Sequence, residues 1–222
     1  MDFDVVGKTE FSMLKVKVPA GETLKVEASA MAAQDSNLKM KTRLKGGFKR
    51  FLSKESLFIN EFTAQGSQAN LMISPGPPGD IGHYRLPGDE EFFITSSCYL
   101  ASETTVEIDT KFQGIWKSML SGEGFFLIKC SGSGDVWFNT YGALIEIDVD
   151  GEYIVDTGHI VAFNQGLDYD IDSVGGYKAL FLSGEAFVAR FRGQGKVWVQ
   201  TKLPLSLVKW ADSYRRIERR SQ

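Results

Sequence analysis

One short signature occurs three times in this chain, as Ser53-Lys54-Glu55, Ser121-Gly122-Glu123 and Ser183-Gly184-Glu185. Each signature closes a stretch that opens with a glycine, at Gly46, Gly114 or Gly176. The three glutamates are about sixty residues apart, and a fixed period of that kind is typical of internal repeats. The signature therefore predicts that one structural unit is copied three times along the chain.

Other landmarks recur in the same phase. A glycine-containing turn with an acidic residue precedes each signature, at 19–22, 87–90 and 150–152. After the signature, Gly134-Asp135-Val136-Trp137 matches Gly195-Lys196-Val197-Trp198, while the first copy reads Gln68-Ala69-Asn70-Leu71. We expect three units at about 14–74, 79–142 and 143–204, with Trp137 and Trp198 buried at equivalent places. Together they form a single domain over 1–204, followed by a basic C-terminal tail over 205–222.

The local patterns predict an all-β fold. Residues 14–18 and 24–27 alternate apolar and polar side chains, which is typical of strands with one wet face, and the turn between them predicts a hairpin. Residues 103–112 and 144–149 alternate in the same way. Strands with turn signals every 8–12 residues indicate a sandwich or barrel. Short helical turns are expected once per unit, at 47–53, 115–120 and 177–182.

Composition favours one compact protein of the cytoplasm. The chain has 222 residues, of which 43% are hydrophobic, enough to bury a large core. The acidic start, Met1-Asp2-Phe3-Asp4, lacks the layout of a signal peptide, and no apolar run reaches the length that crosses a bilayer. Cys98 and Cys130 either pair or stay as buried thiols, and two cysteines do not decide between these states.

The search for chemistry predicts no enzyme, no cofactor and no metal site. His83 and His159 stand alone in two different units, whereas zinc or iron sites gather several histidines with a carboxylate. No nucleophile elbow, zinc-protease motif or phosphate-binding loop occurs. Gly132-Ser133-Gly134 and Gly193-Gln194-Gly195 are interpreted as hairpin turns. Copying of a unit explains Glu55, Glu123 and Glu185 better than an acid triad does.

One charged segment stands out. Residues 39–54 hold seven basic side chains and no acid: Lys39, Lys41, Arg43, Lys45, Lys49, Arg50 and Lys54. The tail from 204 adds five basic residues against two acidic ones, although the whole chain has a formal net charge of −3. The matching places in the other two units carry far fewer basic residues. The molecule is therefore polarised, which orients a protein toward an anionic surface.

Three interpretations of the basic segment remain open. A solvated face is the usual explanation of a charge run. Phe48, Phe51 and Leu52 beside Lys49 and Arg50 instead match an interfacial segment that meets an anionic membrane. Nucleic acid is a third candidate partner, but the sequence pI of about 5.5 and the absence of a basic stripe across all units disfavour it.

Several stretches resemble one family. They are Gly21–Met31, Thr42–Gly47, Glu55–Phe58, Tyr141–Leu144, Asp156–Phe163 and Phe191–Thr201. The chain is similar, from about Phe3 to Thr201, to the uncharacterised bacterial family related to the altered-inheritance-of-mitochondria biogenesis protein. This resemblance implies three repeats of the fold of the tryptophan RNA-binding attenuation protein, a double-stranded β-helix around a pseudo-threefold axis. It also implies self-association, with a trimer favoured, and it supplies no reaction and no catalytic residues.

These observations together predict a non-catalytic, self-associating β scaffold. We expect it to work at a membrane surface, as a cytoplasmic protein peripheral to the membrane, or within a larger complex. One alternative is an RNA-binding module, which rests on fold analogy alone. The other is a small-molecule-binding protein or enzyme, which requires a pocket with convergent polar groups that the sequence does not reveal.

Overall fold

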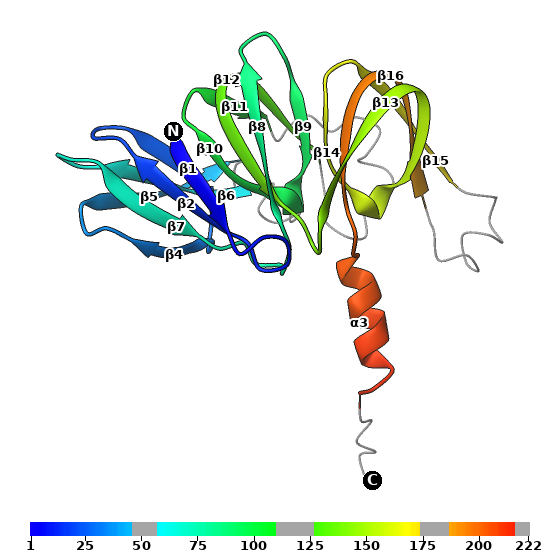
Figure 1. Ribbon diagram of the computed structural model, residues 1–222, viewed down its shortest axis with the longest axis horizontal. Coiled ribbons are helices and arrows are strands. Elements are labelled where there is room, and N and C mark those ends of the chain that lie inside the picture. Colours follow the sequence, from blue (N-terminus) through cyan, green and yellow to red (C-terminus); the bar gives the residue numbers. More distant parts are fainter. Residues whose placement is uncertain (46–56, 110–126, 174–186, 216–222) are drawn as a thin grey trace.

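A computed structural model describes residues 1–45, 57–109, 127–173 and 187–215. The described chain is mostly β-strand, as the sequence predicts, and its described part has one α-helix, near the C-terminal end (Figure 1). The first segment contains β1 (Asp2–Val6), β2 (Met13–Val18), β3 (Thr23–Glu27), β4 (Met31–Gln34), β5 (Leu38–Lys45), β6 (Leu57–Ala64) and β7 (Ala69–Ile73). The helical turns expected at 47–53, 115–120 and 177–182 lie outside the described residues.

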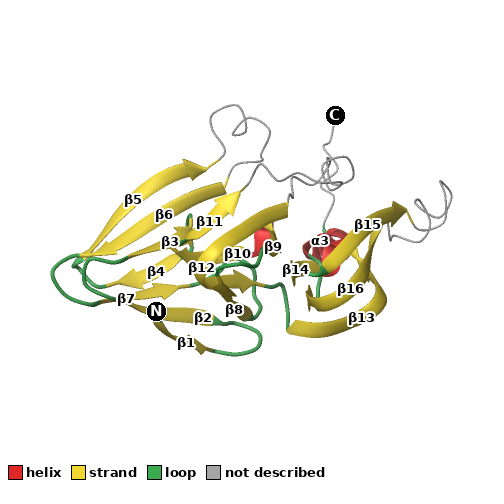
Figure 2. Ribbon diagram, turned by 90° about the horizontal axis from the view of Figure 1, so that it is seen from above, coloured by secondary structure: helices red, strands yellow, loops and turns green. Residues whose placement is uncertain are grey.

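The second and third segments contain fewer, longer strands. The second comprises β8 (Ile81–Pro87), β9 (Phe92–Thr95), the 3-10 turn η1 (Ser96–Cys98), β10 (Tyr99–Glu103), β11 (Val106–Asp109) and β12 (Leu127–Asn139). The third comprises β13 (Leu144–Asp156), the 3-10 turn η3 (Thr157–His159), β14 (Ile160–Asn164), β15 (Leu167–Ser173) and β16 (Phe187–Gln200). The helix α3 (Pro204–Asp212) follows and leads away from the sheets (Figures 1 and 2).

The strands form a four-stranded sheet, in the order β1-β2-β7-β4, and a twelve-stranded sheet that continues through all three segments. The first strand of each predicted unit (14–74, 79–142 and 143–204) pairs antiparallel with the closing one, as β2 with β7, β8 with β12, and β13 with β16. Neighbouring segments are joined by antiparallel pairs between β3 and β10 and between β9 and β14. No described pairing joins the first segment to the third, so the pseudo-threefold axis stays a prediction.

One irregularity recurs in the closing pairs. The register shifts by one residue between Met31 and Ala33 where β4 meets β7. The same shift occurs in β10 against β12, between Tyr99 and Ala101, and in β14 against β16, between Ile160 and Ala162. Such a shift marks a β-bulge, which bends the strand that carries the extra residue. β4, β10 and β14 therefore have the same local backbone geometry.

The interior divides into three apolar clusters along the molecule. The first gathers side chains such as Leu14 and Phe62, the second Phe92 and Phe138, and the third Phe163 and Phe191. Trp137 and Trp198 are 0% and 4% exposed, and they lie opposite Ala101 and Ala162 at the bulges of β10 and β14. The first segment has Met72 at this place, opposite Ala33, so the sequence alignment that put Leu71 there was wrong by one residue.

Two local predictions were wrong. The hairpin over residues 14–27 does not form, because β2 pairs with β1 and β7 while β3 pairs with β6 and β10. The glycine pairs at 132–134 and 193–195 are not turns, since β12 and β16 run straight through them. Gly132 has φ of +90°, and a Cβ there would lie 2.5 Å from the Thr105 carbonyl oxygen. These glycines allow close approach of a neighbouring strand.

Candidate interaction surfaces

The basic segment begins on β5, which pairs with β6 alone among the described strands. Lys39 and Lys41 are exposed and alternate with Met40, which is 49% exposed. Arg43 and Lys45 lie further along the same strand. Lysine on an edge strand discourages pairing with another chain, so this row has a structural use whether or not it also binds an anionic partner.

The rest of the predicted basic site is not covered by the structure. Lys49, Arg50 and Lys54 lie outside the described residues, as do the three signature glutamates Glu55, Glu123 and Glu185. The structure therefore places Lys39 and Lys41 on one exposed strand and leaves the membrane interpretation of the whole segment as a prediction.

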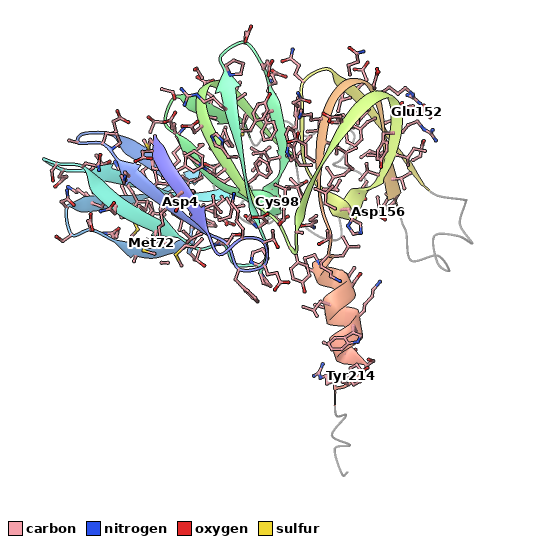
Figure 3. All side chains as sticks on the ribbon, viewed as in Figure 1. Asp4, Met72, Cys98, Glu152, Asp156 and Tyr214 are labelled. Carbon is pink, nitrogen blue, oxygen red and sulfur yellow. The ribbon has the colours of Figure 1, made fainter. Side chains whose placement is uncertain are left out.

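The helix α3 is the second exposed surface. Leu205, Leu207, Val208, Trp210 and Tyr214 are between 47% and 73% exposed, and no residue of α3 is buried. Leu203, Leu207, Trp210 and Tyr214 follow the i, i+4, i+7, i+11 spacing of one helical face. The Trp210 and Tyr214 ring centroids are 5.1 Å apart, and Tyr214 lies far from the β-sheets (Figure 3). α3 thus presents an apolar face that the described chain does not cover.

The most concentrated electrostatic cluster links β1 to the second segment. The Met1 amino group donates hydrogen bonds of 2.8 Å to both Glu103 and Asp135. The His83 Nε2 lies 3.0 Å from Asp135 Oδ1, and Arg85 Nη1 lies 3.0 Å from Asp135 Oδ2. Burial raises the pKa of Asp135, but the hydrogen bonds from Met1, His83 and Arg85 outweigh it and lower the pKa to about 2.

This cluster ties β1 to the second segment. The described residues contain no group of three or more His, Cys, Asp and Glu side chains that could hold a metal ion. The His159 Nδ1–H donates a 2.6 Å hydrogen bond to the Gln200 carbonyl oxygen, far along the chain from His83. The structure therefore does not bring the two histidines of the sequence together.

The cysteines are unpaired thiols in the core. Cys98 is 3% exposed and Cys130 is 0% exposed, and no disulfide joins them. Burial raises the pKa of each thiol to about 12. A thiol that stays protonated at neutral pH is a poor nucleophile and a poor metal ligand, so these side chains serve as apolar packing.

Glu27 is the one carboxyl of the described chain whose pKa burial moves toward neutrality. Desolvation at the end of β3 raises its pKa to about 7. A carboxyl of this kind is a candidate acid or base. No described nucleophile accompanies it, since the nearby Cys98 and Tyr99 are themselves buried groups with raised pKa values.

A third surface was missed by the sequence interpretation. All four residues of β4 are exposed, although Met31, Ala32 and Ala33 are apolar. Tyr153 and Ile154 of β13 are 43% and 48% exposed. For β13, the alternation of apolar and polar residues in the sequence could have indicated this surface. The turn expected at 150–152 does not form, because β13 continues through Gly151, which has φ of +103°.

The fold and these surfaces define a mostly β protein without a membrane-spanning helix among its described residues. Residues 3–202 match the family described as Mitochondrial biogenesis AIM24, and the chain belongs to that family. The sequence resemblance to this family is thereby confirmed.

Two relatives come from Streptococcus pyogenes. An uncharacterised protein of serotype M6 is 26% identical over 229 residues, which cover 97% of this chain and 90% of that protein. The crystal structure of a Streptococcus pyogenes protein superposes with a TM-score of 0.81 at 24% sequence identity, covering 96% of this chain and 99% of that one. The second comparison shows a shared fold, and neither description assigns a function.

Proposed function

We propose that this protein is a non-catalytic, self-associating β scaffold, built from three copies of one unit, that works at an anionic membrane surface. The pairing of opening with closing strands in each segment, and the bulge shared by β4, β10 and β14, support the three-unit interpretation. A trimer is the favoured assembly, and a cytoplasmic location peripheral to the membrane fits it.

The observation that carries the membrane part of the proposal is the exposed face of α3. Trp210 is 62% and Leu207 47% exposed, on a helix that the sheets do not cover. Lys209 and Arg215 flank this face, and the sequence adds Arg216, Arg219 and Arg220. An apolar helical face beside basic residues is the combination that binds the interface of an anionic bilayer.

Charge on β5 supports the same partner. Lys39 and Lys41 are exposed, and the segment that follows carries five more basic side chains in sequence. Each basic residue near an anionic bilayer contributes about 1 kcal/mol of attraction, which salt screens. Binding that depends on both α3 and this segment should therefore weaken as ionic strength rises.

Co-sedimentation with vesicles tests this function. We expect the protein to sediment with phosphatidylserine-containing vesicles more than with neutral ones, and less at high salt. Trp210→Ser and the combined Lys49→Ser, Arg50→Ser and Lys54→Ser variant should each bind less. Phe11→Ser is the matched control, because Phe11 is 75% exposed but belongs to the connection between β1 and β2 and not to α3 or the basic segment.

Two outcomes contradict the membrane role. One is equal sedimentation with neutral and anionic vesicles. The other is salt-sensitive binding to single-stranded RNA, with no retention on vesicles, which favours the nucleic-acid alternative. Light scattering of the same samples reports self-association separately.

A further inference from the structure

Two strand edges are unpaired at opposite ends of the molecule. Among the described strands, β4 pairs with β7 alone and β13 pairs with β16 alone. β4 and β13 lie at the two ends of the long axis in Figure 1. In Figure 3, Met72, which is opposite Ala33 of β4, is at one end, and Glu152 and Asp156 of β13 are toward the other. One chain therefore does not bring these edges together.

The same kinds of strand are paired inside the molecule. β10 pairs antiparallel with β3, with Ala101 opposite Val26. β14 pairs antiparallel with β9 in the next junction, with Ala162 opposite Ile94. Each junction joins the bulged strand of one segment, β10 or β14, to a strand of the preceding segment. In the second junction that strand is β9, which comes directly before η1, and in the first it is β3, at the equivalent place.

β4 is the unmatched bulged strand. Ala33 stands at the bulge as Ala101 and Ala162 do. In β10 and β14 four of the five residues are buried, whereas every residue of β4 is exposed. The difference follows from the neighbour: β3 covers β10 and β9 covers β14, but no described strand covers β4.

The end of β13 is the unmatched partner strand. Val155 precedes Asp156, the residue that caps η3, just as Ile94 precedes Thr95 before η1. By this alignment Tyr153 takes the place of Phe92, which is 0% exposed in its junction, whereas Tyr153 is 43% exposed. Both free edges therefore expose apolar side chains that their internal counterparts bury.

The β4 edge also lacks the protection seen elsewhere on the molecule. β4 reads Met-Ala-Ala-Gln, without charge or proline. β5, by contrast, carries exposed lysines at positions 39 and 41 along its unpaired side. Natural proteins place charge on strand edges that must stay unpaired, so the uncharged β4 edge is suited to pairing.

We propose that β4 of one molecule pairs antiparallel with the end of β13 of a second copy of this chain. The register that continues the internal junctions sets Ala33 opposite Val155 and Gln34 opposite Ile154. The contact is head-to-tail, so it closes into a ring or extends as a filament according to the rotation between copies. This inference rests on the proposed self-association and gives it an interface.

A backbone substitution tests the edge directly. The Asp35 amide donates to the Asn70 carbonyl on the β7 side, and successive residues of a strand direct their N–H groups to opposite sides. The Gln34 amide therefore faces the free edge. We expect Gln34→Pro to weaken self-association about tenfold or more, while Gln34→Ala, which loses the same side chain but keeps the amide, stays like wild type.

Light scattering after gel filtration of the full chain separates the outcomes. Wild type and Gln34→Ala should have a mass that is a multiple of 24.6 kDa, and Gln34→Pro should move toward 24.6 kDa. If Gln34→Pro keeps the wild-type mass, the interface is wrong although self-association stands. If wild type is a monomer at micromolar concentration, the proposed self-association fails as well, whatever the vesicles show.

Cross-linking provides a second test that does not depend on how proline is tolerated. Opposed residues of an antiparallel pair have Cα atoms about 5.5 Å apart, within the range that a disulfide spans. Mixed Gln34→Cys and Ile154→Cys chains should therefore form a covalent heterodimer under mild oxidation. Thr42→Cys, on exposed β5, replaces Gln34→Cys as the control. Equal yields from the two mixtures would overturn the proposed register.

Discussion

Replacing Asp135 with asparagine should destabilise the fold strongly, because this carboxylate joins β1 to the second segment. Its side chain is 8% exposed and contacts the Met1 amino group, His83 and Arg85. The lowering of its pKa from 3.8 to about 2 is worth roughly 2 kcal/mol of stability at neutral pH. Asp135→Asn also leaves the buried ammonium group of Met1 with one carboxylate partner fewer, which adds to the loss of stability.

We therefore expect urea unfolding at pH 7 to show a loss of about 2–4 kcal/mol for Asp135→Asn. Asp4→Asn is the control, since Asp4 is exposed on β1 and should change stability by less than about 0.5 kcal/mol. A loss below about 0.5 kcal/mol for Asp135→Asn would refute the reasoning.

The pH dependence follows from the two pKa shifts of the cluster. The pKa of Asp135 is lowered, so its contribution is complete above about pH 4 and is lost as the pH falls toward 2. Burial lowers the pKa of the Met1 amino group, but its hydrogen bonds to Asp135 and Glu103 raise the pKa by more. The net result is a pKa above the ordinary value of 8.0. Its contribution is complete below pH 8 and is lost as the pH rises through the raised value. The Asp135→Asn deficit should accordingly shrink at acid pH.

Substitutions at three further sites, Gly132, Glu27 and Trp137, have expected outcomes. Gly132→Ala should cost about 2 kcal/mol or more of stability in thermal or urea unfolding, since its Cβ would lie 2.5 Å from a carbonyl oxygen. As a control, Gly21→Ala, with φ of +80° and no heavy atom within 4 Å, should cost about 1 kcal/mol. Glu27→Gln should stabilise the protein by about 2–3 kcal/mol at pH 8 and by little at pH 4, because a pKa raised to about 7 costs stability as the pH rises from 4.5 through 7; an equal effect at both pH values would contradict the assignment. Trp137→Ala should cost about 3–5 kcal/mol at 0% exposure, and Trp137→Phe clearly less, because the indole Nε1 has no partner in the described chain.

The sequence predicted the fold class well because strand alternation is a local property. Residues 14–18 and 24–27 are the cores of β2 and β3. Their pairing was predicted wrongly, since partners are chosen by long-range packing and β2 and β3 enter different sheets. The single strand expected over 103–112 is two strands, β10 and β11, which end and begin around a turn at 104–105. Thr104 in that turn continues the alternation of Val106 and Ile108, as it would in a strand.

The interaction surfaces were less predictable. The basic residues and the apolar start of the tail were both visible in the sequence, but the exposure of that apolar start was not. In the structure no residue of α3 is buried. The exposure of β4 had no local signal, because Met31-Ala32-Ala33 resembles the buried strands and only the absence of a neighbouring strand exposes it.

Hydrogen exchange of the two free edges tests the self-association of the scaffold most directly. At micromolar concentration, where we expect copies of the chain to be joined, the amide of Gln34 and those of residues 152–156 that face away from β16 should exchange slowly. Their exchange should speed up on dilution, to the extent that the assembly dissociates. The same holds in Gln34→Ala, which should dissociate no more than wild type. Exchange at the rate of an unpaired strand edge at every concentration, while the β10 amides that face β3 stay protected, would contradict the account.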